Sequence, residues 1–355
     1  MLRKLLTVKM GGMGAEMADR VLVTGVSGFI GGHLAAELLR RGYSVRGSVR
    51  SPSRIGEVHT AMAAAGVEPA DLDICRLDLL SDQGWAEAAA GCRYVLHVAS
   101  PFVLEKPKDP YTLIRPATEG ATRAVGAALD AGAERVVMTS ALATMQFART
   151  PKGHICTDSD WTDPDDPRLN AYTVSKVRAE RAARELAQRR GAQDRLAVVN
   201  PGAVIGPLLT DDPGTSVTAI QQIMSGALPM VPDLRLPWVD VRDVADVHIA
   251  AMSSAHAGGR RTIIATDPMS LIEVAGVIRE RLPQASHKLP KRAMPTWFTW
   301  LASAFEPQLR DNRWLIGQKQ RFDRTPAETL LGHPLRPVPD AIEETGRSLA
   351  ERRLI

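Results

Sequence analysis

A short apolar strand, a glycine turn and a helix near the amino end constrain the fold of this chain more than any other feature. The strand is predicted over Arg20–Thr24 and the helix over 28–41. The turn between them reads Gly25-x-x-Gly28-x-x-Gly31. Glycines let a backbone approach a pyrophosphate, which the N–H groups at a helix amino end then bind. The pattern predicts a dinucleotide site. An ordinary tight strand-to-helix turn is the alternative, because the common fingerprint is G-x-G-x-x-G.

Strands and helices continue to alternate through the first 200 residues. Further strands are predicted over 43–49, 71–76, 93–98, 134–139 and 195–200. Further helices are predicted over 55–65, 83–90, 109–131, 170–190 and, beyond the last strand, 244–252. Repeated strand–helix units form a parallel sheet covered on both faces. We therefore predict an α/β fold, a doubly wound parallel sheet of the Rossmann type, with ligands at the carboxyl ends of the strands.

Tyr172 and Lys176 lie four residues apart at the head of the helix predicted over 170–190. Residues at this spacing face the same side of a helix, so the ammonium group can lie beside the phenol. A nearby positive charge lowers the pKa of a tyrosine from about 10 toward neutrality, which makes proton donation near pH 7 feasible. Together with the glycine turn, this pair indicates a pyridine-nucleotide reductase.

Composition and cysteine content argue against several other classes of protein. The net charge is only +4, without a basic block, so neither nucleic-acid nor membrane-surface binding is implied. Cys75, Cys92 and Cys156 lack C-x-x-C spacing, so we expect no disulfide framework and no metal site. No apolar run approaches the ~18 residues of a membrane span, and the amino end is a poor signal peptide. A reducing, cytoplasmic location fits these features.

Seven motifs, in order, resemble the extended short-chain dehydrogenase/reductases of the NAD-dependent epimerase/dehydratase superfamily. Within them the resemblance is to the dihydroflavonol reductase and cinnamoyl-CoA reductase group with its bacterial aldehyde and ketone reductase relatives. The motifs are Val23-Thr-Gly-Val-Ser-Gly-Phe-Ile-Gly31, Leu77-Asp-Leu79, His97-Val-Ala-Ser-Pro101, Val136-Val-Met-Thr-Ser140, Tyr172-x-x-x-Lys176, Asn200-Pro-Gly-Ala-Val-Ile-Gly-Pro207 and Val239-Asp-Val-Arg-Asp-Val-Ala245.

The resemblance implies a cofactor site residue by residue. Asp78 matches the acid that holds the adenine edge, although a loop-capping role is the alternative, and 201–204 matches the segment that holds the nicotinamide carboxamide. His97 is interpreted as a buried strand residue. The cofactor-binding residues expected are Gly25, Ser27, Gly28, Phe29, Ile30, Gly31, Arg50, Arg54, Asp78, Leu79, Val98, Ala99, Ser100, Thr139, Tyr172, Lys176, Pro201, Gly202 and Val204.

The end of the second strand favours NADP(H) over NAD(H). An enzyme that prefers NAD usually offers an acid there for the ribose 2′-hydroxyl, and one that prefers NADP offers an arginine. This chain has no acid there. Arg50 occupies the position where the resembling reductases bind the 2′-phosphate, and Arg54 can assist with a charge-assisted contact. A solvated charge at the start of a helix is the alternative for Arg54.

One departure from the family pattern lies in the catalytic residues. The resembling enzymes end the fifth strand in Thr-Ser-Ser, and the second serine holds the substrate carbonyl. Here Ala141 occupies that position, so Ser140 joins Tyr172 and Lys176 as the expected catalytic residue, with Thr144 or a water as the alternative donor. Loss of one such donor costs on the order of 100-fold in rate. The resemblance places the substrate against Phe102 and Gln146.

We therefore expect an NADPH-dependent reductase of an aldehyde or ketone on a small apolar or aromatic substrate, as a monomer or homodimer. The alternatives are a nucleotide-sugar epimerase or dehydratase, a hydroxysteroid dehydrogenase, and a non-catalytic NADP(H)-sensing protein.

The chain is expected to divide into three parts. We predict a disordered N-terminal extension over 1–16 and an NADP-binding Rossmann domain over 17–206, to which 239–265 return. Residues 207–238 and 266–355 are interpreted as a smaller substrate-binding region.

Overall fold

The computed structural model describes residues 18–101, 107, 109–226, 229–284, 289–306, 309–310 and 312–355. The predicted N-terminal extension and Phe102 lie outside these residues. In the part of the chain so described, no helix has the length and apolar character that a membrane crossing needs.

The centre of the structure is a seven-stranded sheet, counted over the described residues, in the order β12-β7-β5-β4-β1-β2-β3. Every neighbouring pair is parallel. The strands are β1 (Arg20–Thr24), β2 (Ser44–Val49), β3 (Leu72–Arg76), β4 (Tyr94–His97), β5 (Arg135–Thr139), β7 (Leu196–Pro201) and β12 (Arg261–Ile264). The chain steps outward from β1 to β3 and then reverses direction at β4. The predicted α/β doubly wound fold is therefore confirmed, and its strand order reverses between β1 and β4.

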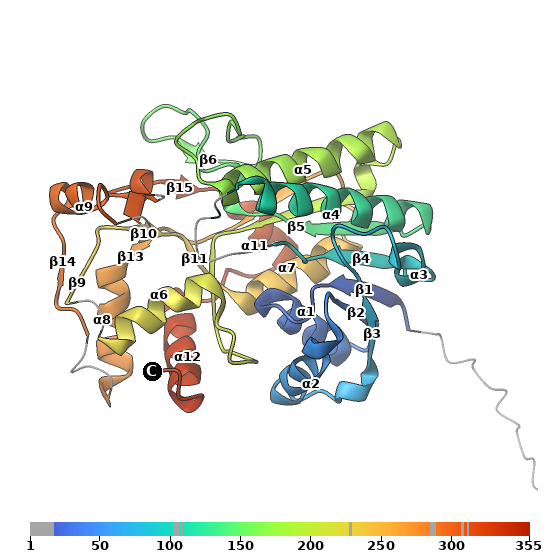
Figure 1. Cartoon of the computed structure of the whole chain (residues 1–355), viewed down its shortest axis with the longest axis horizontal. Helices are drawn as coiled ribbons and strands as arrows, with labels where there is room; N and C mark the ends of the chain where they lie inside the picture. The colour runs from blue at the N-terminus through green and yellow to red at the C-terminus, as the bar shows by residue number, and fades with distance from the viewer. Residues whose placement is uncertain are drawn as a thin grey trace, which may run out of the picture.

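Two layers of helices cover the sheet, each with its own apolar core (Figure 1). One face packs against α1 (Phe29–Arg40), α2 (Ile55–Ala64), α7 (Val241–Ser253) and α11 (Thr325–Leu331). The other packs against α3 (Trp85–Ala89), α4 (Tyr111–Asp130) and α5 (Ala171–Arg189). Because the central strands are buried on both faces, they are almost continuously apolar, as in 94–97 and 135–139.

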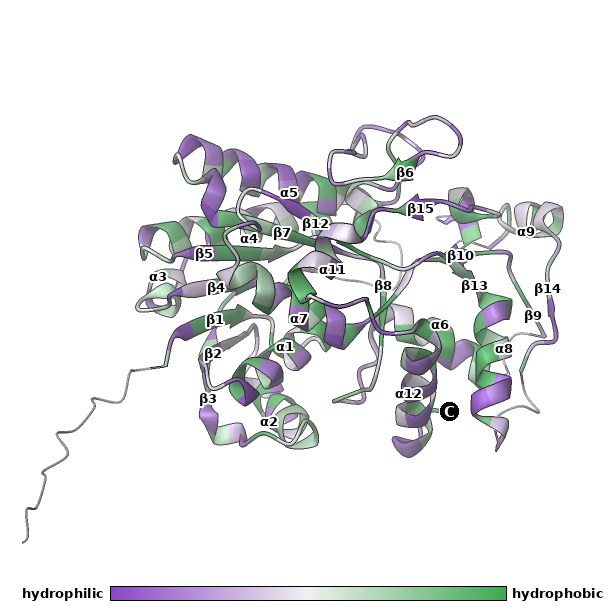
Figure 2. Cartoon of the chain, turned by 180° about the vertical axis from the view of Figure 1, so that it is seen from behind, coloured by the Kyte–Doolittle hydropathy of each residue, from purple (hydrophilic) through white to green (hydrophobic). Residues whose placement is uncertain are grey.

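A third core lies in the C-terminal part, around the fully buried Trp238. Helices α6 (Gly214–Ser225), α8 (Leu271–Arg281) and α12 (Val338–Glu351) pack together there over β8 (Ala203–Ile205) and β11 (Trp238–Asp240). Short strand pairs complete this part: β9 (Met230–Val231) with β14 (Arg292–Ala293), β10 (Arg235–Leu236) with β13 (Met269–Ser270), and β6 (Ile155–Cys156) with β15 (Arg321–Phe322). Helix α8 alternates apolar and polar residues along its length, as expected of a helix with one face against a core (Figure 2).

Most predicted element ends differ from the observed ends by one or two residues. The helix predicted over 244–252 begins earlier, as α7, because the Asp240 side chain accepts a hydrogen bond from the Arg242 N–H at 2.8 Å and caps the helix. Helix α7 packs on the main sheet and β12 joins its edge, although both follow residues 207–238 of the C-terminal part.

Candidate active site

The glycine turn is shaped by two close approaches of the backbone. Gly25 has a φ of +75°, and a Cβ there would come within 2.9 Å of the Ala99 Cα on the neighbouring strand-end loop. A Cβ on Gly31 would come within 2.2 Å of the Gly25 carbonyl oxygen. Larger residues at these two positions would therefore force the first strand, its helix and β4 apart.

Gly28 is the one glycine of this turn that local packing does not explain, so a ligand is the reason left for it. A Cβ there would lie at an ordinary 3.4 Å from the Gly25 oxygen, so local packing does not require glycine. Gly28 precedes α1, and among the described residues no side chain caps this helix and no acid lies in its first turn. The amino end of α1 is therefore electrostatically suited to an anion such as a pyrophosphate.

The two arginines expected to select the cofactor differ in their surroundings. Arg50 is exposed directly after β2. The Arg54 guanidinium is not simply solvated: its Nη2 donates to the Ser27 carbonyl at 3.2 Å and to Glu57 at 2.9 Å, and it lies 3.6 Å from Asp212. The Arg54 cation therefore lies beside the glycine turn. Its acidic partners, Glu57 and Asp212, are at least partly exposed, so a phosphate can replace them.

The ends of β3 and β4 carry the residues expected near the adenine and ribose. Asp78 caps its own loop, because its Oδ1 accepts from the Leu80 N–H at 2.9 Å. Its contact with the adenine edge stays a prediction. Val98 and Ala99 are half-buried, and the Thr24 hydroxyl accepts from both of their N–H groups at 3.1 and 3.0 Å. His97 is a buried strand residue, as interpreted from the sequence.

The Tyr172–Lys176 pair lies at the head of α5, with the Lys176 Nζ 5.9 Å from the centroid of the Tyr172 ring. Burial raises the pKa of Tyr172 to about 12, which corrects the expectation that Lys176 lowers it toward neutrality. The reason is that removing a phenolate from water opposes ionisation more strongly than an ammonium at this distance favours it. Burial also lowers the pKa of Lys176 to about 8, against the opposing effect of Glu180. At pH 7 the pair is thus a neutral phenol beside a predominantly cationic lysine.

Glu180 connects several buried side chains beside the Tyr172–Lys176 pair, and it was not predicted from the sequence as a residue of the site. It is fully buried, one helical turn beyond Lys176, and ion-pairs with the buried Arg261 at 2.5 Å. The spacing of 172, 176 and 180 was the available signal, since it puts all three on one face of α5. Arg261 gave no local signal, because it lies 81 residues further along the chain, on β12.

The Ser140 hydroxyl donates to Glu180 at 2.5 Å, and the Thr144 hydroxyl lies 3.0 Å from the same carboxylate oxygen. Both are buried. A serine hydroxyl has one proton to donate, so in this arrangement Ser140 does not offer it to a substrate. The structure thus places Ser140 close to α5, but its hydroxyl is engaged with Glu180. This geometry does not support its expected role as the carbonyl donor. Ala141, also buried, keeps the position of the family serine.

Three more of the predicted residues, Thr139, Gly202 and Gln146, lie at or shortly after the ends of β5 and β7. Thr139 is buried, with its hydroxyl 2.7 Å from the His248 Nε2. Gly202 allows a close approach, since a Cβ would come within 2.1 Å of the Pro237 carbonyl oxygen. The Gln146 carbonyl accepts from the Gln320 side chain at 3.0 Å, which brings the C-terminal segment next to the predicted substrate residue.

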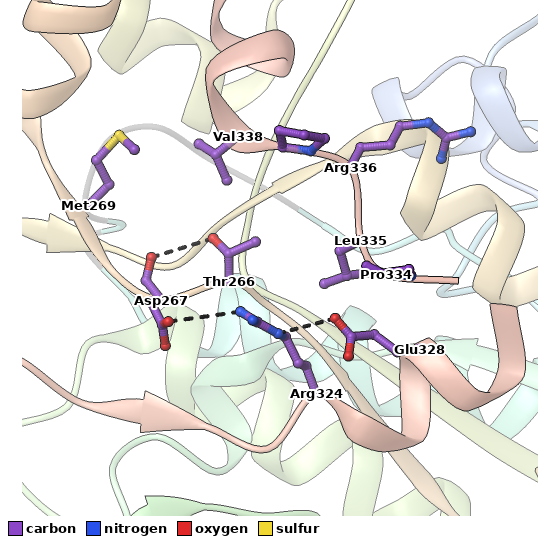
Figure 3. Close-up of a pocket in the computed structure, with 10 residues that line it drawn as sticks. Thr266, Asp267, Met269, Arg324, Glu328, Pro334, Leu335, Arg336 and Val338 are labelled. Carbon is purple, nitrogen blue, oxygen red and sulfur yellow. Dashed lines mark hydrogen bonds and ion pairs between the residues drawn. The ribbon is translucent and has the colours of Figure 1, made fainter. Parts of the chain in front are cut away.

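A separate hollow of about 300 Å³ lies between α11 and the segment after β12 (Figure 3). Arg324 spans it, 3.9 Å from Asp267 and 3.1 Å from Glu328. Its lining includes none of the residues predicted to bind cofactor or substrate. Within the described ranges, no three His, Cys, Asp or Glu side chains gather as metal ligands would.

The fold and the site together define a class. A parallel sheet with a glycine turn at the point where its strand order reverses, and a Tyr-x-x-x-Lys pair on the helix after β5, are those of an extended short-chain dehydrogenase/reductase. The chain belongs to the NAD dependent epimerase/dehydratase family, whose model matches residues 21–265.

Named relatives make the membership more specific. The chain is 36% identical over 244 residues to cinnamoyl-CoA reductase 1 of Petunia hybrida, covering 68% of this chain and 71% of the relative. It is 30% identical over 290 residues to dihydroflavonol 4-reductase of Zea mays, covering 79% of each. The crystal structure of yeast methylglyoxal/isovaleraldehyde reductase complexed with NADPH shares the fold, with a TM-score of 0.77 at 24% identity over 95% of this chain and 100% of that one. The resemblance found in the sequence is therefore confirmed, and the chain has reductases as its homologues.

Proposed function

We propose that this protein is an NADPH-dependent reductase of an aldehyde or ketone carbonyl on a small apolar or aromatic substrate. The observation that carries the proposal is the Tyr172–Lys176 pair, a half-buried phenol beside a buried lysine, on α5 near the carboxyl end of β4. Burial lowers the pKa of His97 at the end of β4, and the charge of the nearby Lys176 lowers it further. The same edge of the sheet holds the glycine turn, so a bound nicotinamide and the pair meet there.

NADPH bound at this edge would supply hydride to the carbonyl carbon. Gly28 and the amino end of α1 would hold its pyrophosphate, and Arg50 and Arg54 its 2′-phosphate. Tyr172 donates its phenolic proton to the carbonyl oxygen, and its raised pKa keeps that proton in place at neutral pH. Lys176 binds the nicotinamide ribose and, as a cation, stabilises the phenolate that proton transfer leaves behind.

Arg50→Ala is expected to reduce the preference for NADPH over NADH by about tenfold or more. The exposed guanidinium at the end of β2 then no longer pairs with the 2′-phosphate, whereas NADH has no such group to lose. Calorimetric titration of both cofactors measures the two affinities. Arg189→Ala, on the exposed face of α5, is the matched control and should leave the ratio unchanged. Equal affinities of the unmodified protein for NADPH and NADH would contradict the cofactor assignment.

Ala141→Ser is expected to raise kcat by roughly tenfold to 100-fold. The added hydroxyl stands in the family position, while those of Ser140 and Thr144 already contact Glu180. Steady-state kinetics with the best carbonyl substrate measures the gain. Ala143→Ser adds the same group two residues further along and serves as the control. If Ser140→Ala lowers kcat by 100-fold while Ala141→Ser does nothing, Ser140 is the donor after all.

The function itself is tested by following NADPH oxidation with a panel of apolar and aromatic aldehydes and ketones, and with nucleotide sugars as a second set. Turnover of the carbonyl set supports the proposal. Conversion of nucleotide sugars without net cofactor oxidation would identify the epimerase or dehydratase alternative, which the motif Ala-Tyr-Thr-Val-Ser-Lys disfavours against the Tyr-Gly-x-Ser-Lys of that branch. Tight NADPH binding with no turnover of either set would identify a cofactor-sensing protein.

A further inference from the structure

Helix α9 (Thr296–Ala302) and the residues that follow it bury small polar side chains and expose large apolar ones. The side chains turned into the protein are small and polar: Thr299 and Ser303 are both 0% exposed. The Thr299 hydroxyl accepts from the Asp233 N–H at 3.2 Å, and the Ser303 hydroxyl donates to the Trp300 carbonyl at 2.6 Å. A surface helix of a globular protein normally shows the opposite pattern, with its apolar face inward.

The large apolar side chains of this segment are turned outward. Trp297 is 70% exposed and Phe305 is 80% exposed. Of the nine exposed large hydrophobic residues in the described part of the chain, five lie within this stretch of nine residues: Trp297, Phe298, Trp300, Leu301 and Phe305. We call these five residues the aromatic face. Single exposed apolar residues are normal, but a contiguous group of this kind marks a contact surface.

The chain segment that carries the aromatic face is rich in basic residues. Residues 289–321 contain six Lys and Arg against two Asp and Glu, so this segment alone accounts for the net charge of +4 of the whole chain. Lys291 and Arg292 are both exposed shortly before α9. Arg292 begins β14, which lies beside α9 at the edge of the molecule (Figure 1). Arg313 stacks over the Trp300 ring at 3.8 Å. Aromatic and basic side chains thus share one surface.

We propose that the aromatic face docks on an anionic lipid surface. Tryptophan and phenylalanine insert at the boundary between headgroups and acyl chains, and the surrounding Lys and Arg are attracted to anionic headgroups. A second copy of this chain fits the aromatic face less well. A twofold interface would set the aromatic face and its basic residues against the same residues of the other copy, and their like charges would repel. The sequence did not indicate this surface, because its positive charges are too dispersed along the chain to form a basic block.

Co-sedimentation of the full chain with phosphatidylcholine vesicles, with and without phosphatidylserine, tests the proposal. We expect binding to strengthen by at least about tenfold when the anionic lipid is present, since each basic residue near the surface contributes about fivefold. Binding should weaken as salt is added. The double variant Trp297→Glu with Phe305→Glu should bind at least about tenfold less. Tyr111→Glu, a change at an equally exposed aromatic residue on α4, is the control and should bind like the unmodified protein.

The charge-reversal pair Lys291→Glu with Arg292→Glu provides a second, independent variant and should also lose more than about tenfold. Unchanged melting temperatures show that the variants fold. Equal binding to both vesicle types, or unchanged binding of both double variants, would overturn the proposal. So would a dimer in sedimentation velocity that Trp297→Glu dissociates while no vesicle binding occurs, because the face is then an interface between copies. NADPH affinity, measured by fluorescence titration, should stay unchanged in these variants, because the expected cofactor-binding residues all lie between 25 and 204. This readout separates the test from that of the proposed function.

Discussion

Tyr172→Phe is expected to lower the rate of carbonyl reduction by about 100-fold to 10,000-fold. The affinity for NADPH should stay nearly unchanged. The substitution removes one hydroxyl and keeps the ring, so the packing at the head of α5 is preserved. The hydroxyl's main task arises in the transition state, where it gives its proton to the carbonyl oxygen. The loss should therefore appear in kcat and in kcat/KM to a similar extent.

Steady-state kinetics and a fluorescence titration with NADPH measure the two quantities separately. Tyr43→Phe removes the same group from a half-buried tyrosine just before β2 and is the matched control. Its kinetics should equal those of the unmodified protein. Carbonyl reduction by Tyr172→Phe at the normal rate would mean that the proposed acid is wrong, whereas a large loss of NADPH affinity would show that the phenol chiefly binds the cofactor.

Arg261→Met is expected to lower the free energy of unfolding by about 3–5 kcal/mol. The guanidinium pairs with Glu180 where neither side chain is more than 3% exposed, so removing it leaves a buried carboxylate without its cation. Arg261 also donates to the Thr144 hydroxyl at 2.8 Å and the Asp160 carbonyl at 2.6 Å, and these acceptors lose a partner too. Urea unfolding at pH 7 measures the change.

The matched control is Arg93→Met, just before β4. Arg93 pairs with Asp19 and Glu134 at the surface, where water screens the charges, so this substitution should change the free energy of unfolding far less than Arg261→Met does. Combining Arg261→Met with Glu180→Gln should recover a large part of the loss, because the buried charge is then removed with its partner. Equal losses for Arg261→Met and Arg93→Met would show that water reaches the Glu180 pair.

Local sequence patterns were sufficient for six of the seven strands of the main sheet, whereas β12 was not predicted as a strand. The strand over 20–24 was predicted with the observed bounds, because an apolar run that ends in a glycine turn is determined within a few residues. The start of α7 was missed, since its cap Asp240 is followed at once by a strand-like run of valine and arginine. The short strand pairs β9–β14 and β15–β6 join residues that are more than 60 positions apart, and nothing in either partner announces the other.

The amino-acid sequence by itself determined the parallel fold, the glycine turn and the Tyr172–Lys176 pair, because each depends on periodicity and spacing over short distances. Only the tertiary structure decided how that site is tuned. It withdrew the Tyr172 phenol from water and so raised the pKa that the sequence had suggested was lowered. It brought Arg261 from β12 to Glu180. The Glu180 carboxylate in turn accepts the hydrogen bond of the Ser140 hydroxyl. It also turned Trp297 outward. Burial and long-range pairing depend on which segments meet in space, and no spacing along the chain encodes them.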